Sequence, residues 1–83
     1  MNLAELADAL NLIGISPNVL ELGGSGEMAW CVEQADDGAW EVYWCERGGK
    51  HDLTRLQTEP QACFYLLGRL TYSQLLAGVI RKT

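Results

Sequence analysis

Two short runs of alternating apolar and polar residues flank an Asp-Asp-Gly sequence at positions 36–38. Alternation with a period of two is typical of a β-strand with one buried face, and a three-residue loop ending in glycine is typical of a hairpin. The register that this loop imposes sets Trp30 opposite Trp44 and Val32 opposite Val42, so each pair on that face is apolar. The agreement between turn and pattern predicts an antiparallel hairpin.

The segments on either side of the hairpin predict helices and further strands. Asn2 and Glu5 form a capping-box pattern in front of a helical apolar period, which Gly14 and Pro17 bring to an end. A second capping box begins at Thr58, with a proline in the first turn. We expect a helix over residues 2–13, strands over 19–22, 28–33, 40–45 and 50–58, and helical structure over 59–82.

These elements make one α+β domain over residues 1–83: an N-terminal helix, an antiparallel meander of three or four strands, and a C-terminal helix packed on one sheet face. Residues 19–22 could join either edge of the sheet. The last strand is expected to bulge or end early, because its alternation weakens. Gly68 and Thr71 leave open whether residues 59–82 form one helix or two, and Arg81 and Lys82 suit a helix C-terminus.

Charge is divided unevenly along the chain. The first 46 residues contain nine carboxylates and no Lys or Arg, whereas the last 37 contain all six basic residues and two acids. The acidic half cannot neutralise itself locally, so we expect it to stay solvated or to meet a basic surface on another molecule. A formal net charge of −5 argues against nucleic acid and anionic membranes as partners, because both are polyanions.

The residue pattern predicts no cofactor, no metal centre and no enzyme activity. Cys31, Cys45 and Cys63 lack the short spacings of zinc ligands, and His51 is expected to flank a turn rather than to pair with the adjacent Asp52. We expect all three cysteines to be structural. Their odd number, together with the absence of a basic N-terminal region, predicts a cytoplasmic protein without a signal peptide.

The two faces of the predicted hairpin differ in character. Trp30, Trp40 and Trp44 lie on the face that the C-terminal helix is expected to cover. The other face carries carboxylates around a tyrosine, and we predict that it binds a basic protein, because aromatic side chains anchor interfaces and charges steer association. The predicted contacts are Glu33, Asp36, Asp37, Glu41, Tyr43 and Glu46, with Glu21 and Glu27 as a weaker second set.

Two stretches of the chain carry a family resemblance: Trp40–Gly48 (WEVYWCERG) and Thr58–Leu67 (TEPQACFYLL), with shorter agreement at residues 12–17 and 22–24. They resemble small bacterial immunity proteins encoded beside polymorphic toxins, including those of contact-dependent inhibition and type VI secretion. The resemblance implies a cytoplasmic, non-enzymatic protein that binds a sibling's toxin domain tightly, often by plugging its active site. It implies no particular contact residues in this chain.

Charge and resemblance together favour an immunity protein whose carboxylates occupy the cationic cleft of a nuclease or an NAD-degrading toxin. We expect simultaneous charge reversal at Asp36, Asp37 and Glu41 to weaken toxin binding without a folding defect. The alternative is a homodimerising adaptor or regulatory protein, in which the acidic half of one copy docks on the basic half of another.

Overall fold

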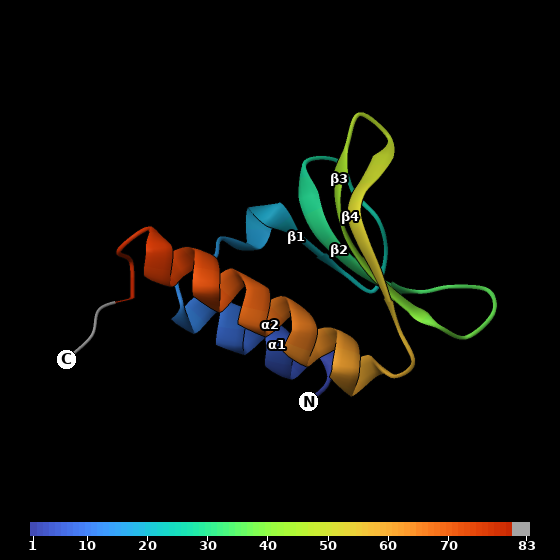
Figure 1. The fold of residues 1–83 in the computed structure, drawn as a ribbon, viewed down its shortest axis with the longest axis horizontal. Helices are drawn as coiled ribbons and strands as arrows, with labels where there is room; N and C mark the ends of the chain where they lie inside the picture. Colours follow the sequence, from blue (N-terminus) through green and yellow to red (C-terminus); the bar gives the residue numbers. More distant parts are fainter. Residues whose placement is uncertain (81–83) are drawn as a thin grey trace.

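A computed structural model describes residues 1–80 of the chain and confirms the α+β architecture (Figure 1). The elements in chain order are α1 (Leu3–Leu12), a 3-10 turn η1 (Pro17–Val19), β1 (Leu20–Leu22), β2 (Ala29–Gln34), β3 (Trp40–Glu46), β4 (Gly49–Leu56) and α2 (Glu59–Leu76). The segment left open as one helix or two is a single helix that passes through Gly68 and ends at Leu76. The expectation for Arg81 and Lys82 lies outside the described residues.

Both helices begin at the predicted caps. The Asn2 side chain accepts a hydrogen bond from the Glu5 N–H at 2.9 Å, and the Glu5 carboxylate accepts one from the Asn2 N–H at 3.0 Å. At the start of α2, the Thr58 hydroxyl accepts a hydrogen bond from the Gln61 N–H at 3.3 Å. The Gln61 side chain accepts from the Gln57 N–H at 3.0 Å and not from Thr58, so only half of the second predicted capping box forms. These side chains satisfy backbone donors that have no partner inside the helix, so the sequence signals for the two starts have a direct physical basis.

The predicted hairpin is present with its predicted register. Trp30 pairs with Trp44 and Val32 with Val42 across β2 and β3. Gly38 has a φ of 89°, the left-handed conformation expected at the end of the loop. The Trp30 and Trp44 rings meet edge to face with their centroids 5.7 Å apart, which adds a favourable cross-strand contact to the register.

The expected irregularity in the last strand is a β-bulge. Val42 pairs with Thr54, whereas Trp44 pairs with His51, so β4 carries one residue more than β3 between these two pairs. Asp52 lies in this interval and has a φ of 55°. Such a bulge bends the strand and increases its twist, which explains why the alternation weakens in this part of the sequence.

The first strand departs from a simple meander. β1 lies at the sheet edge next to β2 and runs parallel to it, giving the order β1-β2-β3-β4. Gly23–Met28, which we call the crossover, therefore returns across the sheet to the start of β2. Parallel neighbours ordinarily need a longer connection, but β1 has only three residues and the return is correspondingly short.

The two helices lie side by side on one face of the sheet (Figure 1). Trp30 and Trp40 are partly buried against the core beneath them, in agreement with the predicted apolar face, and Cys63 is fully buried as a small core residue. Trp44 is also expected there, but it is half-buried beside Trp30 and does not pack against this core. Burying apolar side chains between these two layers is the main stabilising contribution to the fold. The core residues are Leu6, Leu10, Val32, Val42, Ala62, Cys63, Leu66 and Leu70.

The other face of the sheet has a second, smaller core. Ala29, Cys31 and Tyr43 are buried there, with Cys45 packed against them. The crossover covers this cluster, and the Cys31 thiol donates a hydrogen bond to the Gly26 carbonyl at 3.6 Å. The two central strands are consequently covered on both faces, by helices on one and by the crossover on the other.

Candidate protein-binding site

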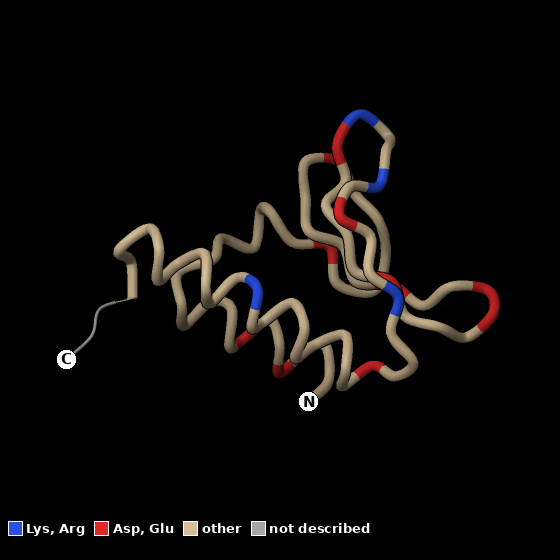
Figure 2. The backbone as a smooth tube through the Cα atoms, in the orientation of Figure 1, with Lys and Arg blue, Asp and Glu red and all other residues tan. Residues whose placement is uncertain are grey.

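The β2–β3 hairpin projects beyond the rest of the molecule and carries two carboxylates at its tip (Figures 1 and 2). Asp36 and Asp37 are both exposed. The Asp37 carboxylate accepts a hydrogen bond from the Ala39 N–H at 3.1 Å, and the Gln34 side chain donates one to the Gly38 carbonyl at 3.1 Å. These bonds hold the loop in one shape, so the tip presents its negative charge on a preorganised turn.

Of the remaining predicted contacts, Glu33, Glu41 and Tyr43 share the face opposite the helices, but two of these three are not accessible. Glu46 lies on the other face of β3, beside Trp44. Tyr43 is 1% exposed and Glu41 is 7% exposed. The expectation of an open surface with a tyrosine at its middle is therefore wrong. The crossover covers Tyr43, whereas two basic side chains of β4 lie against Glu41. Strand alternation alone cannot reveal this cover, because it depends on which distant segments pack beside β3.

An ion-pair network ties the acidic half of the chain to the basic half. The Lys50 ammonium lies 2.8 Å from one Glu41 oxygen and 3.6 Å from Glu33, while Arg55 binds the second Glu41 oxygen at 2.7 Å. Arg55 also pairs with Asp37. The expectation that the acidic half finds no cation within the molecule is thus wrong, because β4 brings basic residues beside β3 from a later part of the chain.

Hydrogen bonding and burial hold these groups in fixed charge states. The hydrogen bond from Lys50 is the largest influence lowering the pKa of Glu41, and the same bond raises the pKa of Lys50. Burial, reinforced by the hydrogen bond that its hydroxyl donates to Glu33 at 2.7 Å, raises the pKa of Tyr43. At neutral pH the network therefore contains ionised carboxylates, a cationic lysine and a protonated tyrosine.

Two further acids lie beside the turn between β3 and β4 and accept hydrogen bonds there. Glu46, a predicted contact, accepts a hydrogen bond from the Trp44 indole at 3.1 Å. Glu27 accepts backbone hydrogen bonds from Arg47 and, at 3.2 Å, from Gly48. Glu27 thereby anchors the crossover to the turn, a structural role that the sequence did not signal since the partners are about twenty residues apart.

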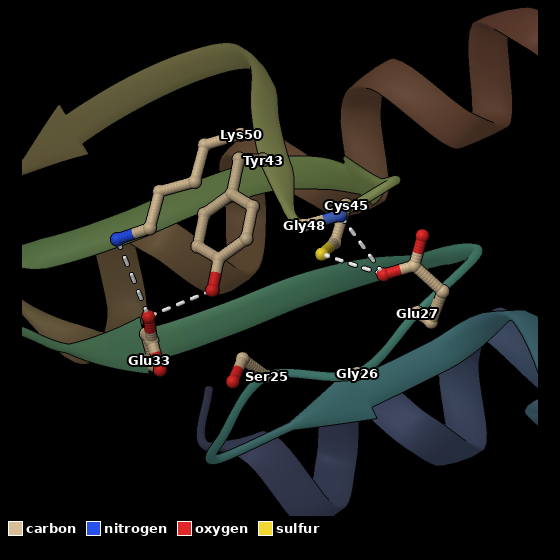
Figure 3. A pocket seen from close by; sticks show the side chains of 8 residues that line it. All are labelled: Ser25, Gly26, Glu27, Glu33, Tyr43, Cys45, Gly48 and Lys50. Carbon is tan, nitrogen blue, oxygen red and sulfur yellow. Dashed lines mark hydrogen bonds and ion pairs between the residues drawn. The ribbon is translucent and has the colours of Figure 1, made fainter.

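A cavity of about 320 Å³ lies between the crossover and the sheet (Figure 3). Its lining residues are Ser25, Gly26, Glu27, Glu33, Tyr43, Cys45, Gly48 and Lys50. Burial, with the nearby Glu27 charge, raises the pKa of Cys45, which keeps this thiol protonated and weakly nucleophilic. The high pKa of Lys50 likewise keeps that amine protonated, so neither group is prepared to act as a nucleophile at neutral pH.

Neither the three cysteines nor the adjacent pair His51 and Asp52 forms a catalytic or metal-binding arrangement in the described residues. The three cysteines are free, and within residues 1–80 no three His, Cys, Asp or Glu side chains form a group suited to a metal ion. His51 approaches the Glu46 carbonyl at 3.4 Å, whereas Asp52 pairs with Arg69 at 3.2 Å. The two adjacent residues therefore have separate partners, as predicted.

The hairpin tip and the ion-pair network behind it remain negative after these internal pairs are counted. Glu33, Asp36, Asp37 and Glu41 contribute four negative charges, and Lys50 and Arg55 return two positive charges, which leaves −2. Asp36 at the hairpin tip has no ion-pair partner among residues 1–80. The accessible part of the predicted surface is thus the hairpin tip rather than the strand face.

No family model, curated protein or solved structure matches this chain. In the described part of the chain no helix is both long enough and apolar enough to cross a membrane.

Proposed function

We propose that this protein is an immunity protein, which binds a cognate secreted toxin domain and blocks its active site without catalysing a reaction. The observation that carries the proposal is the projecting acidic hairpin. Its tip exposes Asp36 and Asp37 on a turn held by internal hydrogen bonds. The resemblance of Trp40–Gly48 and Thr58–Leu67 to immunity proteins supports the same function.

The shape and charge of the hairpin suit a cationic cleft. An enzyme that cleaves nucleic acid or NAD needs positive charge around its substrate's phosphates, and an acidic projection can enter that site in place of the substrate. The network behind the tip holds Glu41, Lys50 and Arg55 in place before any partner arrives. Binding therefore costs little conformational entropy on this side of the interface.

The test begins with toxin domains encoded next to this gene. Each is expressed in a bacterial host with and without this chain, and rescue of growth together with a stable purified complex is the expected result. If no neighbouring toxin domain is neutralised or bound, the immunity proposal is overturned.

The contact surface is tested on the resulting complex. We expect Asp36→Lys to slow association roughly three- to ten-fold at low salt, because it reverses an exposed charge at the tip, and the difference should shrink as salt is added. Asp8→Lys makes the same charge change on α1 and is the matched control. Equal association rates for the two variants would exclude the hairpin tip as the contact.

Simultaneous charge reversal at Asp36, Asp37 and Glu41, which the sequence predicts to weaken toxin binding without a folding defect, is unsuitable for this test. Glu41 is buried between Lys50 and Arg55, so a lysine there would place three cations together and damage the fold. The single substitution Asp36→Lys changes the charge of the tip without breaking any ion pair among the described residues.

The alternative of charge-driven self-association receives less support. Lys50, Arg55 and Arg69 are each paired with an acid of the same chain. A second copy would have to compete with these internal partners for the same cations. An adaptor that docks its acidic half on the basic half of another copy is therefore not favoured.

A further inference from the structure

Helix α2 is apolar on two opposite faces. Its inner face carries Ala62, Cys63, Leu66 and Leu70, all buried in the core. Its outer face, which we define as Phe64, Gly68, Tyr72, Leu75 and Leu76, is exposed to solvent. A surface helix ordinarily has a polar outer face, and no residue among 1–80 covers this second apolar stripe.

The exposure of this outer face is large. Phe64 is 59% exposed, Tyr72 is 63% exposed and Leu76 is 71% exposed. Isolated apolar residues on a protein surface are ordinary, but Phe64, Tyr72 and Leu76 lie along one side of the helix, with Gly68 between the first two. Such a stripe indicates a surface that another helix or protein covers.

Gly68 is a second and independent indication. It lies in the interior of α2, where glycine is unfavourable compared with alanine. A Cβ added at Gly68 would meet no atom of the described residues within 4 Å, so no contact among residues 1–80 requires a glycine there. A residue without a side chain in the middle of an exposed apolar stripe leaves a gap that admits the side chains or backbone of a neighbouring helix.

The stripe is self-complementary about this glycine. Phe64 precedes Gly68 by four residues and Tyr72 follows it by four, so two copies of α2 packed antiparallel about a twofold axis at Gly68 place Phe64 of each copy near Tyr72 of the other. The two glycines face each other at the crossing point, and the aromatic rings lie one turn to either side.

The charge distribution favours a second copy over a basic partner. No residue of the outer face is charged. Arg69, the nearest cation on the helix, is held at the sheet side of α2 by Asp52 and lies 5.0 Å from the centroid of the Trp30 ring. A chain with a net charge of −5 can approach another copy of itself most easily through its uncharged face, whereas a basic partner is attracted to the acidic sheet end.

We propose that the outer face of α2 binds the same face of a second copy and forms an antiparallel, twofold-symmetric helix pair. Applying the exposed fractions of Phe64, Tyr72, Leu75 and Leu76 to large side chains of ~150–250 Å² gives at most roughly 360–600 Å² of apolar surface per copy, less than the ~800 Å² of a standard interface. The dimer is accordingly weak, with a dissociation constant in the micromolar range or above. It leaves the acidic hairpin free for a toxin.

The experiment is sedimentation equilibrium of the purified chain from ~1 μM to ~1 mM, at low and at high salt. We expect monomer at the lowest concentration and dimer at the highest, with the dimer retained in high salt because its interface is apolar. A chain that stays monomeric throughout, or a dimer that dissociates on addition of salt, would overturn the proposal.

Gly68→Gln separates the interface from the fold. Glutamine favours a helix more than glycine does and meets no atom within the chain, so the variant should remain folded with at least its original helicity by circular dichroism. Its side chain fills the gap, and we expect the dissociation constant to rise at least about ten-fold. Leu12→Gln, at an 85% exposed apolar residue of α1, is the control and should leave the dimer unchanged. A dimer unaffected by Gly68→Gln, or weakened equally by both variants, would contradict the assigned face.

Discussion

At the scale of single residues, Glu41 is the centre of the polar side of this protein. It is buried beside Tyr43 and binds a different cation with each carboxylate oxygen, Lys50 at 2.8 Å and Arg55 at 2.7 Å. The two cations are themselves 45% exposed, so water screens part of the interaction. Glu41 therefore stabilises the β3–β4 pair by joining two side chains of β4 to one position on β3.

We predict that Glu41→Gln lowers the free energy of unfolding by about 1–3 kcal/mol. Glutamine preserves the size of the side chain but removes the charge that both cations face, and the partial exposure of those cations keeps the loss below that of a fully enclosed pair. Urea unfolding followed by tryptophan fluorescence measures the change. Glu21→Gln, at an exposed carboxylate of β1, is the control and should shift the free energy by less than about 0.5 kcal/mol. A similar loss in both variants would show that Glu41 has no special role.

At the scale of elements, the β2–β3 hairpin follows from short-range rules. The loop requires a left-handed residue, Gly38 supplies it at a φ of 89°, and the apolar alternation of both strands agrees with the resulting register. Short-range rules explain only part of the α2 helix. Its caps and inner face are explained within the chain, whereas its outer face and Gly68 are explained by a second copy.

For the hairpin we predict that Gly38→Ala destabilises the protein by about 1 kcal/mol or slightly more. A Cβ at Gly38 would meet no atom within 4 Å, so the cost comes from the positive φ alone. Gly24→Ala is the matched control, since Gly24 is also free of contacts at its Cβ position but has no left-handed φ, and it should be neutral or slightly stabilising. Equal unfolding midpoints for the two variants would mean that the loop conformation does not depend on glycine.

At the scale of the whole molecule, charges separated in the sequence become neighbours in space. The acidic first half supplies Glu33, Asp37 and Glu41, and the basic second half supplies Lys50 and Arg55. The interaction between the halves is therefore part of folding. Under the proposed function, the excess of acid at the hairpin tip is what remains to bind a toxin.

This arrangement predicts a pH dependence of stability. The pKa values of Asp37 and Glu41 are lowered in the folded state, from ordinary values of 3.8 and 4.5, so their contribution is present above these values and is lost as the pH falls through the folded pKa values. The pKa of Tyr43 and that of Lys50 are raised from 10.0 and 10.5, so their contribution is present below these values and is lost as the pH rises through the folded ones. The pKa values of Cys45 and Cys63 are also raised from 9.0, mainly by burial, so stability begins to fall above that value. We expect a plateau of stability between about pH 4.5 and pH 9.

Urea unfolding across this pH range measures the plateau. In Glu41→Gln the loss of stability below pH 4.5 should be shallower than in the unchanged protein, because one of the two shifted carboxylates is gone. If the free energy of unfolding fell equally steeply below pH 4.5 in both proteins, other carboxylates would control acid unfolding.

Features that depend on neighbouring residues were readable from the chain alone. The capping residues Asn2 and Thr58, the hairpin register around Gly38 and the bulge in the last strand all arise from interactions over a few positions or across one tight turn. Such interactions leave a local pattern because the residues that make them are close in sequence. The hairpin tip, the accessible part of the candidate site, belongs to this group.

Features that depend on contacts between distant segments required the folded molecule. The parallel pairing of β1, the cover that the crossover places over Tyr43, and the partners that Lys50 and Arg55 find on β3 all come from segments brought together only by the sheet. Neither hydrophobic period nor net charge encodes which distant side chain becomes a neighbour. For this reason the alternation of β3 correctly assigned Glu41 and Tyr43 to one face, while only tertiary packing decided that this face is buried.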